Sequence, residues 1–197
     1  MYSHYPNLLL GFHGCNKSVF NEVVKKSRPL AQSNNSYDWL GSGVYFWENS
    51  YARAFDWASE RHGDDAAVVG TVIDLGHCLN LTDYENSEIV YQGYLSLKNN
   101  VKKNNLVMPQ NKNIKTNEDW LIRDLDCAVI NHIHVLNNMM GYEPFDSVRG
   151  IFTEGRPIYP GAGFRGKTHV QLCIRSPKCI KGYFSPLDGD GSIMKYQ

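Results

Sequence analysis

Two short glycine-bounded segments in the first quarter of the chain constrain its fold most. The first reads Gly-Phe-His-Gly-Cys at 11–15, and the second reads Leu-Gly-Ser-Gly-Val-Tyr-Phe-Trp-Glu at 40–48. Both join apolar or aromatic residues to glycine, which is typical of buried strands where another group comes close to the backbone. Between them, apolar residues recur at helical spacing over 19–24, and Asn16 or Ser18 is a candidate cap for this helix. The sequence therefore predicts a strand, a helix and a second strand in this order.

Length and composition favour a single domain over residues 1–197. The chain is 42% hydrophobic, which is enough for a sizeable core, and its 20 basic and 20 acidic residues cancel. A balanced charge gives no general attraction to nucleic acid or to a membrane surface, and we interpret its lysine clusters as solvated surface. Five scattered cysteines form no disulfide framework and no Cys-x-x-Cys metal site, so we expect no metal and a reducing cytoplasm. The sequence shows no signal peptide and no apolar run of membrane-spanning length, so we expect a cytoplasmic, soluble protein.

The remaining chain alternates helical and strand patterns, which predicts an α+β domain. Asn49 or Ser50 is a candidate cap for a helix, and a Val- and Ile-rich strand follows it at 66–75. Later elements are helices at 85–100 and 119–139, short strands at 150–153, 158–159 and 169–175, and a loose tail over 188–197. The Asn- and Lys-rich stretch 99–116 is a candidate mobile insertion.

His13 and Tyr45 are the side chains with chemistry in the two opening motifs. A His beside glycine on a strand can hydrogen-bond a ribose or an amide, while the glycine lets a ligand approach the backbone. A Tyr on a neighbouring strand offers a flat face on which an aromatic ring can stack. Each residue alone is more often a core residue than a ligand contact, so the pairing and its order carry the interpretation.

With a matching final strand at 169–175, the chain resembles the ADP-ribosyltransferases of the poly(ADP-ribose) polymerase and diphtheria-toxin type, whose signature is His, Tyr and Glu on three strands. The resemblance implies split mixed or antiparallel β-sheets with flanking helices, and NAD as substrate. It implies that His13 hydrogen-bonds the adenosine ribose and the nicotinamide amide, and that the backbone of Gly14 also binds that amide. Tyr45 would stack on the nicotinamide ring.

The third signature position holds Gln171 where the family has Glu. A neutral amide stabilises the oxocarbenium-like charge of glycosidic cleavage far less than a carboxylate does. Glu154 and Glu48 are candidates for a compensating carboxylate, although each is also a plausible surface or structural acid. Arg53 is a candidate partner for the pyrophosphate. The glycine-containing loop 161–167 lies where the family contacts its target.

We therefore hypothesise a mono-ADP-ribosyltransferase, of the toxin kind, that transfers ADP-ribose from NAD to a macromolecular acceptor, protein or nucleic acid, and releases nicotinamide. Gln171 favours transfer of a single unit. An antitoxin or inhibitor is a further candidate partner, and no membrane is expected. Two alternatives stay open: a module that binds NAD or ADP-ribose without turnover, and an NAD glycohydrolase with water as acceptor. An NAD-dependent RNA 2′-phosphotransferase is disfavoured by Tyr45.

Overall fold

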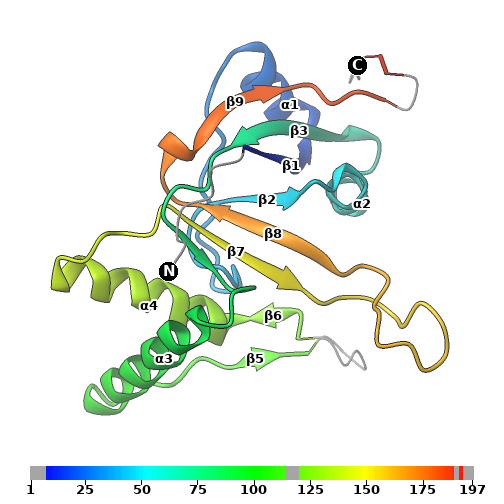
Figure 1. Ribbon diagram of the computed structural model, residues 1–197. Helices are drawn as coiled ribbons and strands as arrows, with labels where there is room; N and C mark the ends of the chain where they lie inside the picture. The colour runs from blue at the N-terminus through cyan, green and yellow to red at the C-terminus, as the bar shows by residue number, and fades with distance from the viewer. Residues whose placement is uncertain (1–7, 114–119, 189–190, 193–197) are drawn as a thin grey trace.

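A computed structural model describes residues 8–113, 120–188 and 191–192. In these ranges the chain forms one α+β domain, with four α-helices, a seven-stranded mixed sheet and a two-stranded hairpin (Figure 1). The elements in chain order are β1 (Leu9–Asn16), α1 (Lys17–Phe20), a π-helical turn (Asn21–Lys25), β2 (Val44–Glu48), α2 (Tyr51–His62), a 3₁₀ turn (Gly63–Asp65), β3 (Ala66–Ile73), β4 (Cys78–Asn80), α3 (Asn86–Lys103), β5 (Asn111–Lys112), β6 (Ile122–Arg123), α4 (Asp124–Met140), β7 (Ser147–Phe152), β8 (His169–Ile174), a second 3₁₀ turn (Pro177–Cys179) and β9 (Ile180–Phe184).

The large sheet has the strand order β4-β7-β8-β2-β1-β3-β9. All neighbours are antiparallel except β4 and β7, which run parallel. The small sheet pairs β5 with β6. The two strands that carry the opening motifs, β1 and β2, are therefore direct neighbours at the centre of the large sheet, and β8 lies on the other side of β2.

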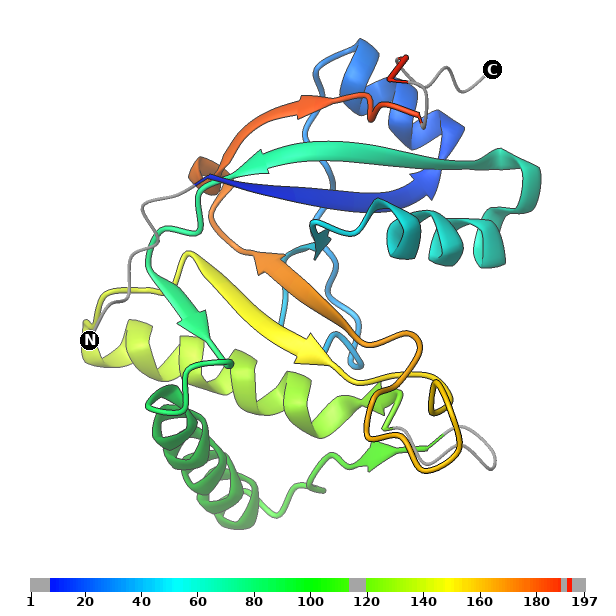
Figure 2. The same ribbon diagram turned by 45° about the vertical axis from the view of Figure 1, so that its right-hand side comes forward.

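The pairing between β1 and β2 is short. It consists of the pairs Gly11–Glu48 and Phe12–Trp47, whereas β1 and β3 pair over eight residues. The expected division into separate sheets is therefore wrong for this chain, because hydrogen bonding makes one sheet. The two halves nevertheless diverge beyond Phe12, where the strand continues through His13 paired with β3 (Figure 2).

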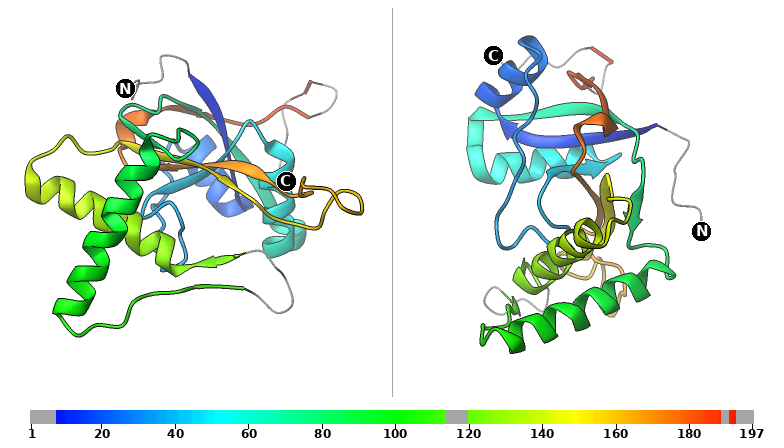
Figure 3. Two further views of the ribbon diagram at one scale, coloured as in Figure 1. Left: turned by 60° about the horizontal axis from the view of Figure 1, so that its bottom comes forward. Right: turned by 90° about the vertical axis from the view of Figure 1, so that its left-hand side faces the viewer.

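The two faces of the sheet are covered by different helices. On one face, α1 and the π-helical turn bury Phe20 and Val23 against Phe46, Val69 and other strand residues. On the opposite face, α2 packs on β1 and β3, and α3 and α4 cover the half that contains β4 and β7 (Figures 1 and 3). Trp47 and Cys173 therefore lie on the α2–α4 face, because side chains alternate along a strand.

Gly14 permits the close packing of α2 on β1. A Cβ atom at this position would lie 2.3 Å from the backbone oxygen of Ala54 and 3.2 Å from the Trp57 ring. A glycine is therefore required here by the approach of the helix, a reason independent of any ligand.

Most predicted elements are confirmed, with changed boundaries. Asn16 caps α1 by accepting a hydrogen bond from the Val19 amide at 2.8 Å, whereas Ser50 occupies the N-cap position of α2 without a side-chain hydrogen bond. The second strand begins only at Val44, since Gly41 adopts a φ of 81° that interrupts the extended chain.

Other predictions are wrong. Residues 158–159 form no strand but belong to a loop, and β4 and β9 were not predicted. Helix α3 continues to Lys103 and β5 forms at 111–112, so both elements enter the stretch 99–116, whose interpretation as an insertion stays a prediction. Residues 114–116 of that insertion, residue 119 of the predicted helix, and 189–190 and 193–197 of the predicted tail lie outside the described residues.

The five cysteines are buried and unpaired, as predicted. Burial raises the pKa of the Cys78, Cys127 and Cys179 thiols to about 11. Within the described ranges no group of His, Cys, Asp and Glu side chains is arranged to hold a metal ion. In the same residues, no helix is both long enough and apolar enough to cross a membrane.

Candidate functional site

The predicted residues on β2 and β8 meet on the α2–α4 face. In the antiparallel register, Trp47 is opposite Gln171 and Tyr45 is opposite Cys173. Residues directly opposite in such a pair point to the same face. Gln171 is therefore beside Trp47 and on the same face as Tyr45, whose own partner is Cys173, two residues further along β8.

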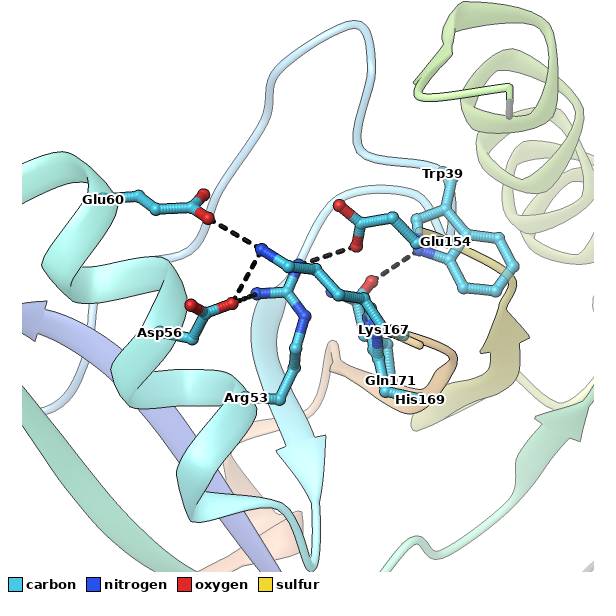
Figure 4. Close-up of polar contacts among 8 residues, drawn as sticks. All are labelled: Trp39, Arg53, Asp56, Glu60, Glu154, Lys167, His169 and Gln171. Carbon is cyan, nitrogen blue, oxygen red and sulfur yellow. Dashed lines mark hydrogen bonds and ion pairs between the residues drawn. The ribbon is translucent and has the colours of Figure 1, made fainter. Parts of the chain in front are cut away.

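Gln171 is held by a tryptophan from the loop before β2. The Trp39 indole N–H donates a hydrogen bond to Oε1 of Gln171 at 2.6 Å (Figure 4). The indole lies directly against β7 because Gly150 leaves the space: a Cβ there would be 2.5 Å from the Trp39 ring. Trp39 thus fixes the orientation of the Gln171 amide.

Arg53 and Glu154 form an ion pair on this face. Nη2 of Arg53 lies 2.6 Å from a carboxylate oxygen of Glu154, and Nη1 lies 3.2 Å from Asp56 (Figure 4). The side chains are 11% and 21% exposed, so both charges are largely removed from water. Arg53 comes from the first turn of α2, and Glu154 follows β7, whose Phe152 pairs with His169 two residues before Gln171. The sequence candidates Arg53, Glu154 and Gln171 are therefore brought to one region.

Lys167 ties the loop between β7 and β8 to α2. Its ammonium lies 2.9 Å from Asp56 and 2.8 Å from Glu60, and these hydrogen bonds raise the pKa of Lys167 (Figure 4). The tether belongs to the loop 161–167 that the sequence singled out. It connects that loop with the acidic side of α2, next to the Arg53–Glu154 pair.

His169 lies between two aromatic rings at the start of β8. Its ring is stacked on Phe152 at 5.5 Å and is 6.0 Å from the Trp47 ring. Nδ1 donates to the Lys167 carbonyl at 2.6 Å, since a carbonyl oxygen can only accept. Burial lowers the pKa of His169, so the ring is neutral at pH 7.

Three buried nitrogens near His169 have no hydrogen-bond partner within the described residues. They are Nε2 of His169, Nε1 of Trp47 and Nε of Arg53. The Arg53 guanidinium carbon is 5.9 Å from the centre of the Trp47 ring. Buried unpaired polar atoms cost free energy, and both ring nitrogens of His134 on α4 are unpaired too, so this feature is not confined to the Gln171 region.

Tyr45 occupies the predicted strand, but its hydroxyl is engaged by protein. It donates to the Gly41 carbonyl at 2.8 Å and accepts from the Leu40 amide at 3.0 Å. Burial raises the pKa of Tyr45, so the phenol stays protonated. The ring packs beside the core under α4. Its hydroxyl therefore stabilises the glycine-rich turn at Gly41.

The structure does not bring His13 to the face of Gln171. His13 contacts Phe46, with ring centres 5.9 Å apart, on the face covered by α1. Its Nδ1 donates to the Tyr45 carbonyl at 2.8 Å, at the point where β1 and β2 diverge. Burial lowers the pKa of His13, which leaves Nε2 of the neutral ring as an acceptor.

Glu48 also lies away from the Gln171 cluster. Both of its carboxylate oxygens bind Arg149, at 2.6 and 2.9 Å, in a two-pronged ion pair. Arg149 further contacts Asn80 and Thr82. Glu48 is therefore a structural acid that links β2 to β7 and β4, which was the alternative interpretation of this residue.

With this geometry established, comparisons with known proteins add nothing: no family model, no curated protein and no solved structure matches the chain. The assignment of chemistry therefore depends on the residues themselves.

Sequence reasoning missed three residues of this region, namely Trp39, Trp47 and His169, and it singled out Lys167 only as the end of the loop 161–167. Strand alternation could have found two of them, because residues two apart on a strand point to the same face. Trp47 lies two residues after Tyr45, and His169 lies two residues before Gln171. The assembled group offers a guanidinium, a carboxylate and an oriented amide beside buried aromatic rings; the guanidinium suits a phosphate and the amide a ribose hydroxyl.

Proposed function

We propose that the protein is an NAD-dependent mono-ADP-ribosyltransferase acting on a macromolecular acceptor. The observation that carries the proposal is the position of Glu154. Gln171 lacks the charge that the reaction needs, and Glu154 supplies a carboxylate on the same face, held by Arg53 at 2.6 Å. The sequence motifs around His13 and Tyr45 support the proposal independently, through their resemblance to the ADP-ribosyltransferases.

Arg53 gives a way to recruit that carboxylate only when NAD is bound. A guanidinium binds phosphate oxygens in the same two-pronged geometry as carboxylate oxygens. The NAD pyrophosphate would compete with Glu154 for Arg53, and Asp56 would keep the guanidinium in place. Glu154 would then be free to face the ribose. Because the ion pair is largely buried, electrostatic interactions there are strong, and the free energy of this exchange depends on the charge of the ligand.

The transfer step needs two contributions from this chain. As the bond between the ribose anomeric carbon and nicotinamide breaks, its electron pair stays with nicotinamide, which leaves neutral, and the carbon develops positive charge. Glu154 stabilises that charge, and the Gln171 amide, oriented by Trp39, hydrogen-bonds a ribose hydroxyl. The acceptor's lone pair forms the new bond to carbon, and Glu154 accepts the acceptor's proton.

His13 is the residue that the resemblance assigns to the nicotinamide amide. Burial lowers the pKa of His13, and its ring donates from Nδ1 to the Tyr45 carbonyl, so Nε2 of the neutral ring remains as an acceptor. His13 and Gln171 point to opposite faces of the sheet, so one NAD molecule would contact both only if β1 and β2 separated beyond Phe12, where they are not paired.

A second candidate function is a module that binds NAD or ADP-ribose without turnover. One observation favours it: Glu154 is already neutralised by Arg53, and the Gln171 carbonyl oxygen already accepts from Trp39. If the ligand fails to displace these contacts, binding occurs without cleavage.

One experiment separates the two functions. The purified protein is incubated with cell lysate and NAD labelled in its adenylate half, and the label is followed in the protein, nucleic-acid and small-molecule fractions. Label in a macromolecular fraction, lost in Glu154→Gln and kept in the exposed-carboxylate control Glu60→Gln, supports transfer. Label found only as free ADP-ribose indicates a glycohydrolase. Unchanged NAD that raises the thermal midpoint of the protein indicates the binding module.

A further inference from the structure

A cavity lies next to the Gln171 site, and Trp39 is part of its wall. It has a volume of about 340 Å³ and lies between α3, α4 and the β6 end of the hairpin. Trp39 belongs to both regions, because its indole N–H binds Gln171 while the ring lines the cavity. None of the functional residues discussed above, Trp39 apart, contributes to the wall.

Four of the eleven residues that line this cavity present flat groups, and five others are aliphatic. The flat groups are the Trp39 indole, the Tyr91 and Tyr94 rings from α3, and the Arg123 guanidinium. Arg123 is held flat against aromatic rings, 4.8 Å from the centre of Trp39 and 4.2 Å from that of Phe152. Planar π-systems and a stacked guanidinium are the surfaces on which a heteroaromatic ring binds.

Asp126 gives the cavity a directional polar group. One of its oxygens accepts from the Asn111 amide at 2.8 Å, and the other lies 3.8 Å from Arg123. The side chain is 37% exposed, so it keeps acceptor capacity on the cavity side. A carboxylate beside a stacked cation matches a ring that presents both an N–H donor and a ring-nitrogen acceptor on one edge.

We propose that the cavity beside Trp39 binds a nucleobase with an exocyclic amino group, of the adenine or cytosine class. The ring would stack among the aromatic groups, its amino group would donate to Asp126, and its ring nitrogen would accept from Arg123. The volume of about 340 Å³ accommodates one base with its sugar. This site goes beyond the proposed function, since binding here needs neither NAD cleavage nor Glu154.

The test is a calorimetric titration of the full chain without NAD. Adenosine is expected to bind, and purine riboside, which lacks only the amino group, to bind about tenfold more weakly. Asp126→Asn should weaken adenosine to a similar degree and remove the difference between the two ligands. Failure of both adenosine and cytidine to bind, or equal binding of adenosine and purine riboside, would overturn the proposal.

Two further variants separate the site from general effects. Tyr91→Ala removes a ring that is 55% exposed and should weaken adenosine about fivefold while the thermal midpoint stays unchanged. Tyr84→Ala, an 83% exposed ring outside the cavity wall, is the matched control and should bind as the wild type does. Equal affinities for these two variants would contradict the assignment.

Competition identifies where the base comes from. If NAD displaces adenosine in the Glu154→Gln variant, the base is the adenine of the dinucleotide; if a single-stranded oligodeoxyadenylate displaces it and NAD does not, the base belongs to a nucleic acid. Both results support the cavity assignment. Adenosine binding without label transfer in the lysate experiment would refute the proposed function but not this inference. Label transfer without adenosine binding would refute this inference but not the proposed function.

Discussion

The ion pair between Arg53 and Glu154 should couple two segments that are 101 residues apart in the chain. The perturbation is a double-mutant cycle with Arg53→Gln, Glu154→Gln and both together. Glu154→Gln leaves Arg53 with Asp56 at 3.2 Å, so we expect a loss of about 1.5 kcal/mol. Arg53→Gln leaves the 21% exposed Glu154 carboxylate without its cation, and we expect about 3 kcal/mol.

The double variant should lose less than the sum of the two single losses, because neither charge then remains unpaired. The expected coupling energy is about 1–2 kcal/mol. For a chain of 197 residues each kcal/mol corresponds to roughly 2–4 °C, so Glu154→Gln should lower the thermal midpoint by about 3–6 °C.

The assay is urea unfolding followed by tryptophan fluorescence, with thermal unfolding as a second probe. The control is Glu60→Gln, which removes a 58% exposed carboxylate from Lys167 and should change stability by less than about 0.5 kcal/mol. A coupling below about 0.3 kcal/mol, the level seen for independent sites, would refute the claim that the pair is a buried, linked unit.

Three other substitutions test separate parts of the structure. Gly14→Ala should cost about 2 kcal/mol or more, because its Cβ would lie 2.3 Å from the Ala54 oxygen; an unchanged urea midpoint would contradict this packing. Tyr45→Phe should cost about 1–3 kcal/mol, because the Leu40 amide loses its acceptor and the Gly41 carbonyl keeps only the weak Cys173 thiol donor at 3.4 Å; a stability equal to wild type would show that the turn does not need the hydroxyl. Burial lowers the pKa of His134 to about 3, so the unfolded chain binds this proton first and stability falls as pH drops from about 6.5 towards 3, by about 1.4 kcal/mol per pH unit. His134→Leu should remove that part of the slope between pH 7 and pH 5, and an unaltered slope would exclude His134 as its source.

Local patterns in the sequence predicted the elements whose own residues determine them. The strand at 66–75 and the helix starting near Asn86 follow from apolar periodicity, and Asn16 was found as a cap because its side chain acts on the next turn. β4 and β9 were missed since short strands of three and five residues depend on partners distant in the chain.

The site was predictable in part for the same reason. Gln171 and Glu154 were identified from their motifs, and strand register then brought them together with Arg53. Whether two residues share a face depends on register, and the sequence does not show that His13 faces Phe46 instead of Gln171. The role of Trp39 was not predictable, because Trp39 lies in a loop and its partner Gln171 is 132 residues away in the sequence.

The most direct measurement of the central claim is the initial rate of nicotinamide release from NAD by the purified protein in the presence of lysate. The account predicts release by the wild type and by Glu60→Gln, and a loss of at least a hundredfold in Glu154→Gln, the order of magnitude for removing one transition-state charge. Equal rates for the wild type and Glu154→Gln, or no release by any of the three, would contradict it.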